Sequence, residues 1–164
     1  MSLRNSSTHY QVPPTTTFAT APDFAVLLVP GGIGTRNPML NSTIDFIKQR
    51  SSKVQYIISV CTGALLLSNA GVLDGRRATT NKASYKSVTA TNEKVDWIPH
   101  ARWVVDENIW TTSGVSSGID GTLAFIECLY GQEVVTRVVN NMEDKRTLDS
   151  EDDPFADIWN VTAI

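Results

Sequence analysis

The sequence predicts an α/β fold in which helices cover both faces of a mainly parallel sheet. Two observations support this: apolar runs of strand length at residues 25–29 and 54–60, and a helical pattern after each run. Strands that alternate with helices form parallel sheets, because each crossover helix packs back onto a face of the sheet. The 164 residues suit a single domain, 1–164, with an irregular lead-in over 1–24 and a core over 25–157.

The first half of the core predicts a strand, a loop, a helix, a strand and a helix. These elements span residues 25–29, 30–34, 38–50, 54–60 and 62–69. The first strand is apolar throughout, which is typical of a strand buried on both faces. Pro38 is expected to open the first helix, and Leu40, Ile44 and Ile47 share one face of it.

The second half predicts a short strand, a polar helix, a β-hairpin and two helices. These elements span residues 78–80, 83–91, 102–105 with 109–112, 117–130 and 132–142. The helix over 117–130 has the strongest pattern, and Gly131 ends it. Its apolar stripe consists of Ile119, Leu123, Ile126 and Tyr130.

Composition excludes several classes of function. The net charge of −3 gives no basic excess for nucleic acid or an anionic membrane surface. No apolar run approaches the roughly 20 residues of a membrane helix, and the N-terminus lacks the apolar core of a signal peptide. Two cysteines are too few for a disulfide framework. We therefore expect a cytoplasmic protein that needs no metal or other cofactor.

Residues 59–63, Ser-Val-Cys-Thr-Gly, carry the clearest functional signal. An expected strand ends at Cys61 and an expected helix begins at Thr62. Such a turn pushes its side chain out of the sheet and beside a helix N-terminus, where a thiolate is favoured. The pattern is the cysteine counterpart of the G-x-S-x-G nucleophile elbow, with Ser59 in place of the first glycine. The alternative is that Cys61 is a small buried hydrophobic residue.

Two loops are expected at the carboxyl edge of the sheet, at residues 30–32 and 61–63. Ligands of open α/β sheets bind at this edge. If the two strands are neighbours, the N–H groups of Gly32 and Thr62 converge near Cys61. They would then stabilise the oxyanion formed when a thiolate attacks a carbonyl-like or nitrile-like carbon. The alternative is that the glycine pair of the first loop only makes a tight turn.

Four ordered blocks of sequence resemble the core of the ThiJ/PfpI family. They are residues 26–32, 59–64, 73–80 and 112–120, within a resemblance that covers about 15–157. The family belongs to the class I glutamine-amidotransferase-like superfamily, so the resemblance implies a flavodoxin-like three-layer sandwich. The branch with this Cys-Thr-Gly elbow is similar to isonitrile hydratases and to the sensor domains of some transcription regulators.

The resemblance implies roles for particular residues. Cys61 becomes the nucleophile, and Gly32 and Thr62 become the oxyanion donors. A pocket for a small-molecule substrate is expected from Gly31, Asn81, Gly114, Val115 and Ser116. The family also implies a homodimer.

Two departures from the family pattern concern proton transfer. Relatives carry a histidine where this chain has Asn81 and Lys82, and the chain's histidines, His9 and His100, match no motif. The family's first strand, its acidic residue and its second strand have no counterpart before the Pro-Gly-Gly strand. We therefore expect a sheet without its first strands, in a truncated or divergent member that turns over isonitriles or small amides feebly or not at all.

Two functions remain open. Cys61 either drives a hydratase or hydrolase reaction, or it is oxidised or lines a ligand pocket in a non-catalytic member. Other conspicuous residues have plainer explanations: His9 and His100 as surface residues, the four tryptophans as core or interface residues, Asp120 as an anchor for a helix start, and 150–153 as solvated. Cys128 is expected to be inert within the apolar stretch 125–129.

Overall fold

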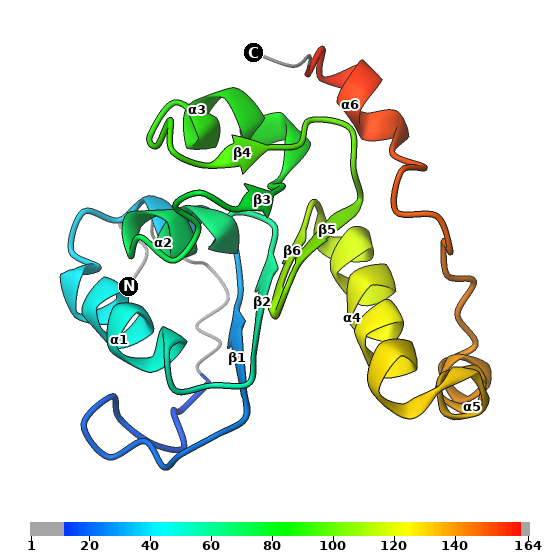
Figure 1. Cartoon of the computed structure of the whole chain (residues 1–164), viewed down its shortest axis with the longest axis horizontal. Coiled ribbons are helices and arrows are strands. Elements are labelled where there is room, and N and C mark those ends of the chain that lie inside the picture. The colour runs from blue at the N-terminus through cyan, green and yellow to red at the C-terminus, as the bar shows by residue number, and fades with distance from the viewer. Residues whose placement is uncertain (1–11, 162–164) are drawn as a thin grey trace.

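The computed structural model describes residues 12–161 and contains a four-stranded sheet in the order β1-β2-β6-β5 (Figure 1). The strands are β1 (Val26–Val29), β2 (Tyr56–Val60), β5 (Trp103–Asp106) and β6 (Ile109–Thr112). β1 pairs with β2 and β2 with β6 in parallel, whereas β5 and β6 form the expected antiparallel hairpin. The prediction of a mainly parallel sheet is confirmed.

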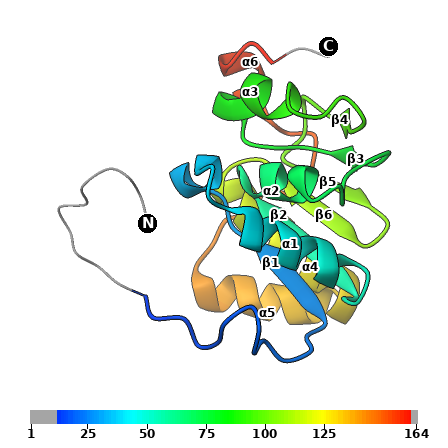
Figure 2. The same ribbon diagram turned by 90° about the vertical axis from the view of Figure 1, so that its left-hand side faces the viewer.

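Helices lie on both faces of this sheet. The first face carries α1 (Asn41–Ser51) and α2 (Gly63–Asn69), and the second carries α4 (Val115–Tyr130), next to which lies α5 (Gln132–Met142) (Figures 1 and 2). Strand alternation divides the core accordingly, because Ile57 packs in the cluster with α1 and α2 while Ile58 packs with Phe125 of α4. The three-layer arrangement follows the prediction.

A smaller unit stands beyond the carboxyl edge of the parallel strands (Figure 1). It contains a two-stranded parallel sheet, β3 (Arg77–Ala78) with β4 (Asp96–Trp97), and the short helix α3 (Tyr85–Thr89). The last helix, α6 (Pro154–Ile158), lies beside it. The sequence analysis missed β4 and α6, because two-residue strands and one-turn helices carry too little periodicity to be recognised.

Two 3₁₀ turns complete the described elements: η1 (Ile33–Arg36) and η2 (Lys82–Ser84). The helix expected from Pro38 begins instead at Asn41, and the helix expected from Ser117 begins at Val115. Within residues 12–161, no helix combines the length and the apolar character needed to cross a membrane.

The expectation that the first strand is buried on both faces is wrong. Leu27 and Val29 are buried, but Val26 and Leu28 on the other face are 38% and 51% exposed. β1 is an edge strand of the described sheet, and its only described partner is β2. A continuous apolar run therefore does not distinguish a strand buried on both faces from one with an exposed face.

The expected packing face of α4 is also wrong. Ile119 and Tyr130 of the predicted apolar stripe are exposed, although Leu123 is buried. The face that meets the sheet contains Gly118 and Gly121, whose missing Cβ atoms would lie 2.7 Å from Val60 Cγ1 and 2.6 Å from Thr112 Cγ2. Small residues let this helix approach the strands closely, while Ile119 and Tyr130 are turned away from them.

Candidate active site at the Cys61 turn

The turn between β2 and α2 holds Cys61 in an unusual backbone conformation. β2 ends at Val60, α2 begins at Gly63, and Cys61 between them has a φ of 59°. A left-handed conformation costs a residue with a Cβ roughly 1–2 kcal/mol. Strained residues of this kind cluster at functional sites, and the nucleophile elbow is one example. The predicted strand–turn–helix at this cysteine is present, and its side chain is partly exposed.

Hydrogen bonds to the Cys61 backbone hold the turn from two sides. The Cys61 N–H donates to the carbonyl oxygen of Thr112 at 3.0 Å, which ties the turn to the end of β6. The Cys61 carbonyl oxygen accepts a hydrogen bond from Thr80 Oγ1 at 3.1 Å. Contacts that fix both the N–H and the carbonyl group of Cys61 stabilise the strained conformation.

Two glycines allow the first loop and the Cys61 turn to touch. A Cβ on Gly31 would lie 2.6 Å from both Thr62 N and Val60 O, and a Cβ on Gly63 would lie 2.2 Å from Val29 O. Because the obstructing atoms belong to the backbone, neither position has room for a side chain. The structure thus brings the loop and the turn together, as expected from neighbouring parallel strands, and Gly31 makes the contact between them.

The expected oxyanion donors are only partly available. The Gly32 N–H donates to Thr62 Oγ1 at 2.9 Å, and Thr35 Oγ1 donates to the same oxygen at 3.0 Å. The prediction of a free Gly32 amide is therefore corrected: the Thr62 hydroxyl occupies it, an interaction that backbone reasoning did not foresee. The backbone N–H of Thr62 has no hydrogen-bond partner within residues 12–161, so it remains a candidate donor.

A pocket of about 430 Å³ is lined by residues that follow the two hydrogen-bond partners of Cys61 in the sequence, but not by Cys61 itself. Its lining residues are Asn81, Lys82, Ala83, Ser113, Gly114, Val115, Ser116, Ser117, Ile119, Phe155 and Trp159. Asn81 follows the residue that bonds the Cys61 carbonyl, and Ser113 follows the residue that bonds the Cys61 N–H. Four of the predicted pocket residues thus share one cavity, while Gly31 belongs to the neighbouring loop contact.

Asn81 has a structural role as well as a place in this pocket. Its Oδ1 accepts a hydrogen bond from the Ser84 N–H at 3.2 Å and so caps η2. His100 is exposed, as expected, and His9 lies outside the described residues. Within the lining of the pocket, Lys82 is the single titratable side chain.

Lys82 is a buried cation that the sequence analysis did not recognise. Its side-chain nitrogen donates to Thr79 Oγ1 at 2.7 Å and to the Ala101 carbonyl at 2.9 Å, and lies 3.2 Å from Asp153 Oδ2. Burial lowers the pKa of Lys82, although the Asp153 carboxylate opposes this shift. Asp153 was expected in a solvated segment and is instead buried. No local pattern connects residues so far apart in the chain.

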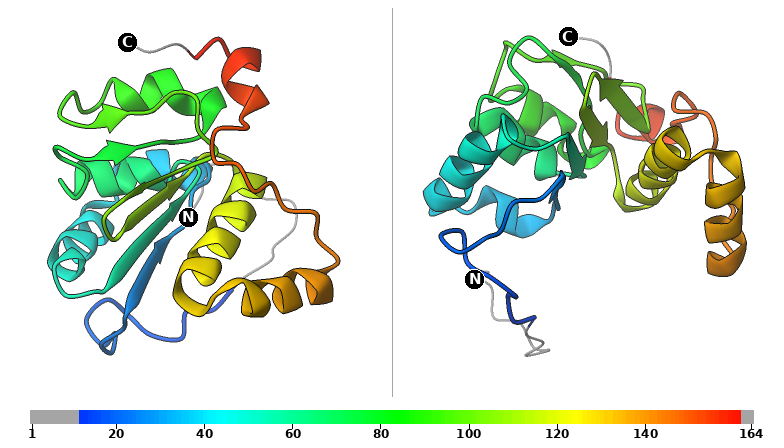
Figure 3. Two further views of the ribbon diagram at one scale, coloured as in Figure 1. Left: turned by 45° about the vertical axis from the view of Figure 1, so that its right-hand side comes forward. Right: turned by 60° about the horizontal axis from the view of Figure 1, so that its bottom comes forward.

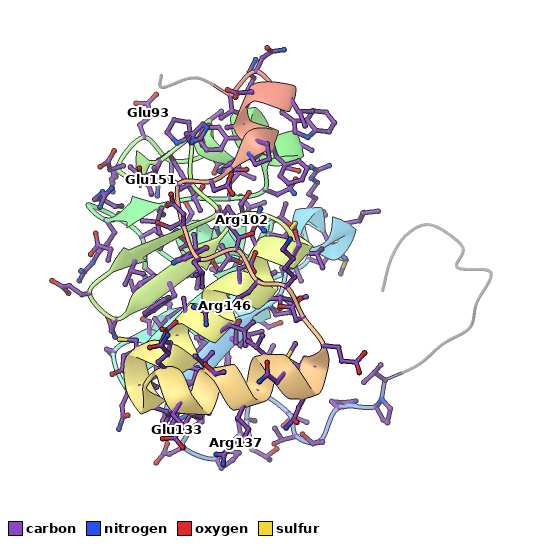
Figure 4. All side chains as sticks on the ribbon, turned by 90° about the vertical axis from the view of Figure 1, so that its right-hand side faces the viewer. Glu93, Arg102, Glu133, Arg137, Arg146 and Glu151 are labelled. Carbon is purple, nitrogen blue, oxygen red and sulfur yellow. The ribbon has the colours of Figure 1, made fainter. Side chains whose placement is uncertain are left out.

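The segment between α5 and α6 runs along α4 (Figure 3). Arg102 and Arg146 lie along this segment (Figure 4). Asp120 accepts hydrogen bonds from Arg102 at 2.5 Å and from the Thr147 N–H at 2.9 Å, so it fastens the segment to α4. The expectation that Asp120 anchors a helix start is corrected, because it lies in the second turn of α4.

Two further expectations concern exposed side chains. Cys128 was expected within an apolar environment, but its side chain is exposed on α4, whereas Phe125 of the same stretch packs against the sheet. Trp103 and Trp110 belong to the core, as expected, whereas Trp159 is exposed at the pocket.

Comparison with known protein families identifies the group to which this arrangement belongs. The model of the DJ-1/PfpI family matches residues 2–128, which is more than half of the chain. The chain belongs to the DJ-1/PfpI family. The ThiJ/PfpI resemblance of the four sequence blocks is thereby confirmed.

Individual members of the DJ-1/PfpI family show how far the similarity extends. An isonitrile hydratase from Pseudomonas putida is 40% identical over 141 residues, which are 84% of this chain and 60% of that protein. A THiJ/PfpI family protein from Pseudomonas syringae matches with a TM-score of 0.71 at 33% identity, over 83% of this chain and 56% of the other. DJ-1beta from Drosophila melanogaster matches with a TM-score of 0.70 at 26% identity, over 83% of this chain and 74% of the other. The chain therefore spans little more than half the length of the first two relatives.

Proposed function

We propose that this DJ-1/PfpI family member is a hydratase or hydrolase that acts on a small molecule, such as an isonitrile, through Cys61. The observation that carries the proposal is the left-handed backbone of Cys61 at the strand-to-helix turn. The 40% identity with an isonitrile hydratase supports the choice of substrate. A partly exposed thiol at such a turn can reach an electrophilic carbon.

The reaction with an isonitrile needs only water as a second substrate. The Cys61 sulfur adds to the isonitrile carbon, and the thiol proton moves to the same carbon to give an enzyme-bound thioimidate. Water then adds across the carbon–nitrogen double bond, with its oxygen on carbon and a proton on nitrogen. As the carbon–sulfur bond breaks, the hydroxyl proton returns to sulfur and an N-substituted formamide leaves. The Thr62 N–H is the proposed donor to the developing oxyanion.

We expect turnover to be weak. The titratable side chain in the pocket lining is Lys82, which is already bonded to Thr79, Ala101 and Asp153. General acid–base catalysis by a well-placed group contributes about 10²- to 10⁴-fold. A site without it retains the nucleophile and the backbone donor, and loses most of the rate.

The test is steady-state hydration of an alkyl isonitrile by the wild type, Cys61→Ser and Cys128→Ser. We expect slow formamide production that Cys61→Ser abolishes and Cys128→Ser leaves unchanged. The Cys128 variant controls for loss of a thiol elsewhere. Activity that survives in Cys61→Ser would contradict the proposal, and so would an inert wild type whose Cys61 is only oxidised. The second outcome would favour the redox-sensing alternative.

We also propose that the chain self-associates as a homodimer in a reducing, cytoplasmic setting. The support is the exposed apolar face of the edge strand β1, with Val26 and Leu28 at its surface. An unpaired strand edge with apolar side chains favours association. Light scattering of the wild type should give a dimer at micromolar concentrations, and Leu28→Lys should shift it towards the monomer. A wild-type monomer throughout that range would contradict this proposal.

A further inference from the structure

The first turn of α4 offers free hydrogen-bond donors to the pocket. α4 begins at Val115, and its first hydrogen bond to the preceding loop runs from the Gly118 N–H to the Gly114 carbonyl at 2.9 Å. The N–H groups of Val115, Ser116 and Ser117 precede that bond, and no side chain caps them. All three residues line the pocket. The helix dipole adds partial positive charge at this end.

Two buried hydroxyl groups at the same place lack partners. Ser113 is 3% exposed and Ser117 is 1% exposed, and both line the pocket. Within residues 12–161, neither hydroxyl forms a hydrogen bond with the protein, and neither oxygen is completely enclosed by it. Buried hydroxyls are normally hydrogen-bonded, because desolvation without a partner is unfavourable. Both residues line the pocket, so a ligand there can supply the missing hydrogen-bond partners.

No negative charge in the pocket lining opposes an anion there. Lys82 is the charged residue of the lining, and no carboxylate belongs to that lining. Asp153, the nearest acid to Lys82, is buried and accepts hydrogen bonds at the start of α6. Backbone N–H groups at a helix start bind anions even where no free cation is present.

Part of the pocket lining is apolar. Ile119, Phe155 and Trp159 line it, and each is partly exposed. A volume of about 430 Å³ lies within the usual range for small-molecule sites. A ligand that satisfies both sides has an anionic group at one end and a hydrocarbon or aromatic portion at the other.

We infer that this pocket binds a small carboxylate with an aromatic or aliphatic tail. The carboxylate accepts hydrogen bonds from the first turn of α4 and from Ser113 and Ser117, and the tail contacts Phe155 and Trp159. Binding of such a carboxylate does not depend on the proposed function. Only the identification of this ligand as part of the substrate rests on it. The substrate class is then a carboxylate-bearing isonitrile, with its reactive carbon at Cys61.

The test measures binding without catalysis, in the Cys61→Ser protein, by calorimetric titration with phenylacetate and with its neutral analogue phenylacetamide. We expect phenylacetate to bind about tenfold or more tightly than phenylacetamide, since hydrogen bonds to charged groups are the stronger ones. Because Cys61 is absent, a failure here is distinct from a failure of the hydration assay.

Two proline variants make the assignment specific. Val115→Pro removes the first N–H of α4 at a position where proline suits a helix, and the exposed Val115 side chain contributes little to the core. We expect it to weaken phenylacetate binding about tenfold. Gln132→Pro makes the same change at the first residue of α5, outside the pocket lining, and should leave binding unchanged.

A further variant serves if Val115→Pro fails to fold. Ser117→Ala removes one hydroxyl from the pocket and should weaken phenylacetate binding more than phenylacetamide binding. Equal affinities for the two compounds would overturn the inference. So would absence of phenylacetate binding up to millimolar concentrations, or equal effects of the two proline variants.

Discussion

Cys61 and Cys128 differ in backbone conformation as well as in exposure. Cys61 lies in a strained left-handed turn whose N–H and carbonyl are both bonded to neighbouring segments. Cys128 is the more exposed of the two and lies within the regular helix α4. Accessibility alone predicts that Cys128 is the more reactive thiol, whereas the local backbone geometry predicts that it is Cys61.

The two surroundings also differ in how closely their backbones pack. The turn at Cys61 touches the loop after β1 backbone to backbone, with Gly63 at the contact. The helix that carries Cys128 approaches the sheet through Gly121, but there the nearest atoms belong to side chains. Side chains can shift by a few tenths of an ångström, and hydrogen-bonded strands cannot. The difference predicts that the turn is rigid and the helix contact adaptable.

The largest expected effect comes from filling these two contacts. Gly63→Ala places a Cβ against Val29 O and should lower the free energy of unfolding by about 3 kcal/mol, the upper range for overpacking. Gly121→Ala meets the Thr112 methyl group and gains helix propensity, so its loss should be less than half as large. Urea denaturation measures both. Equal losses would contradict the rigid turn.

A smaller effect is expected at the two cysteines themselves, where the difference in stability between a Gly and an Ala variant should have opposite signs. At position 61, Gly should be more stable than Ala by about 1 kcal/mol, because glycine adopts a positive φ without strain. At position 128, Ala should be more stable than Gly by about 0.5–1 kcal/mol, since glycine weakens a helix interior. Thermal unfolding of the four variants gives the two differences. The same sign at both positions would show that Cys61 is not strained.

The smallest effect concerns the segment that contains Thr80, whose hydroxyl donates to the Cys61 carbonyl and so supports the turn. Asp106 accepts a hydrogen bond from the Arg77 N–H at 2.8 Å and pairs with Arg76, and these contacts lower its carboxyl pKa from 3.8. The stabilisation is therefore present above about pH 4 and is lost as the pH falls through the folded-state pKa.

Asp106→Asn tests this support. It should lower stability by up to about 1 kcal/mol at pH 6, because the ion pair is partly screened by solvent. The difference from wild type should shrink below pH 4, where the wild-type carboxyl becomes protonated. Urea denaturation at several pH values would contradict the account if the difference stayed constant.

The sequence was sufficient for the elements that depend on local pattern. The runs at 25–29 and 54–60, and the Cys-Thr-Gly block after the second, predicted the sheet and the sharp strand-to-helix turn, but not its positive φ. The sequence was insufficient for contacts between residues that are far apart along the chain. The partner of Lys82 lies near the end of the chain, and the Thr62 hydroxyl occupies an amide in another loop. The apolar stripe of α4 was misleading because glycines, which carry no hydrophobic signal, face the sheet.

The measurement that tests the central claim most directly is the rate of alkylation of the two cysteines. The folded protein is treated with iodoacetamide at neutral pH, quenched over a time course and analysed by peptide mass mapping. The account predicts that Cys61 is labelled much faster than Cys128, although Cys128 is the more exposed thiol. The order should disappear in urea, where both cysteines are unfolded. Equal labelling in the folded protein, or labelling of Cys128 first, would contradict the claim that the turn makes Cys61 the reactive nucleophile.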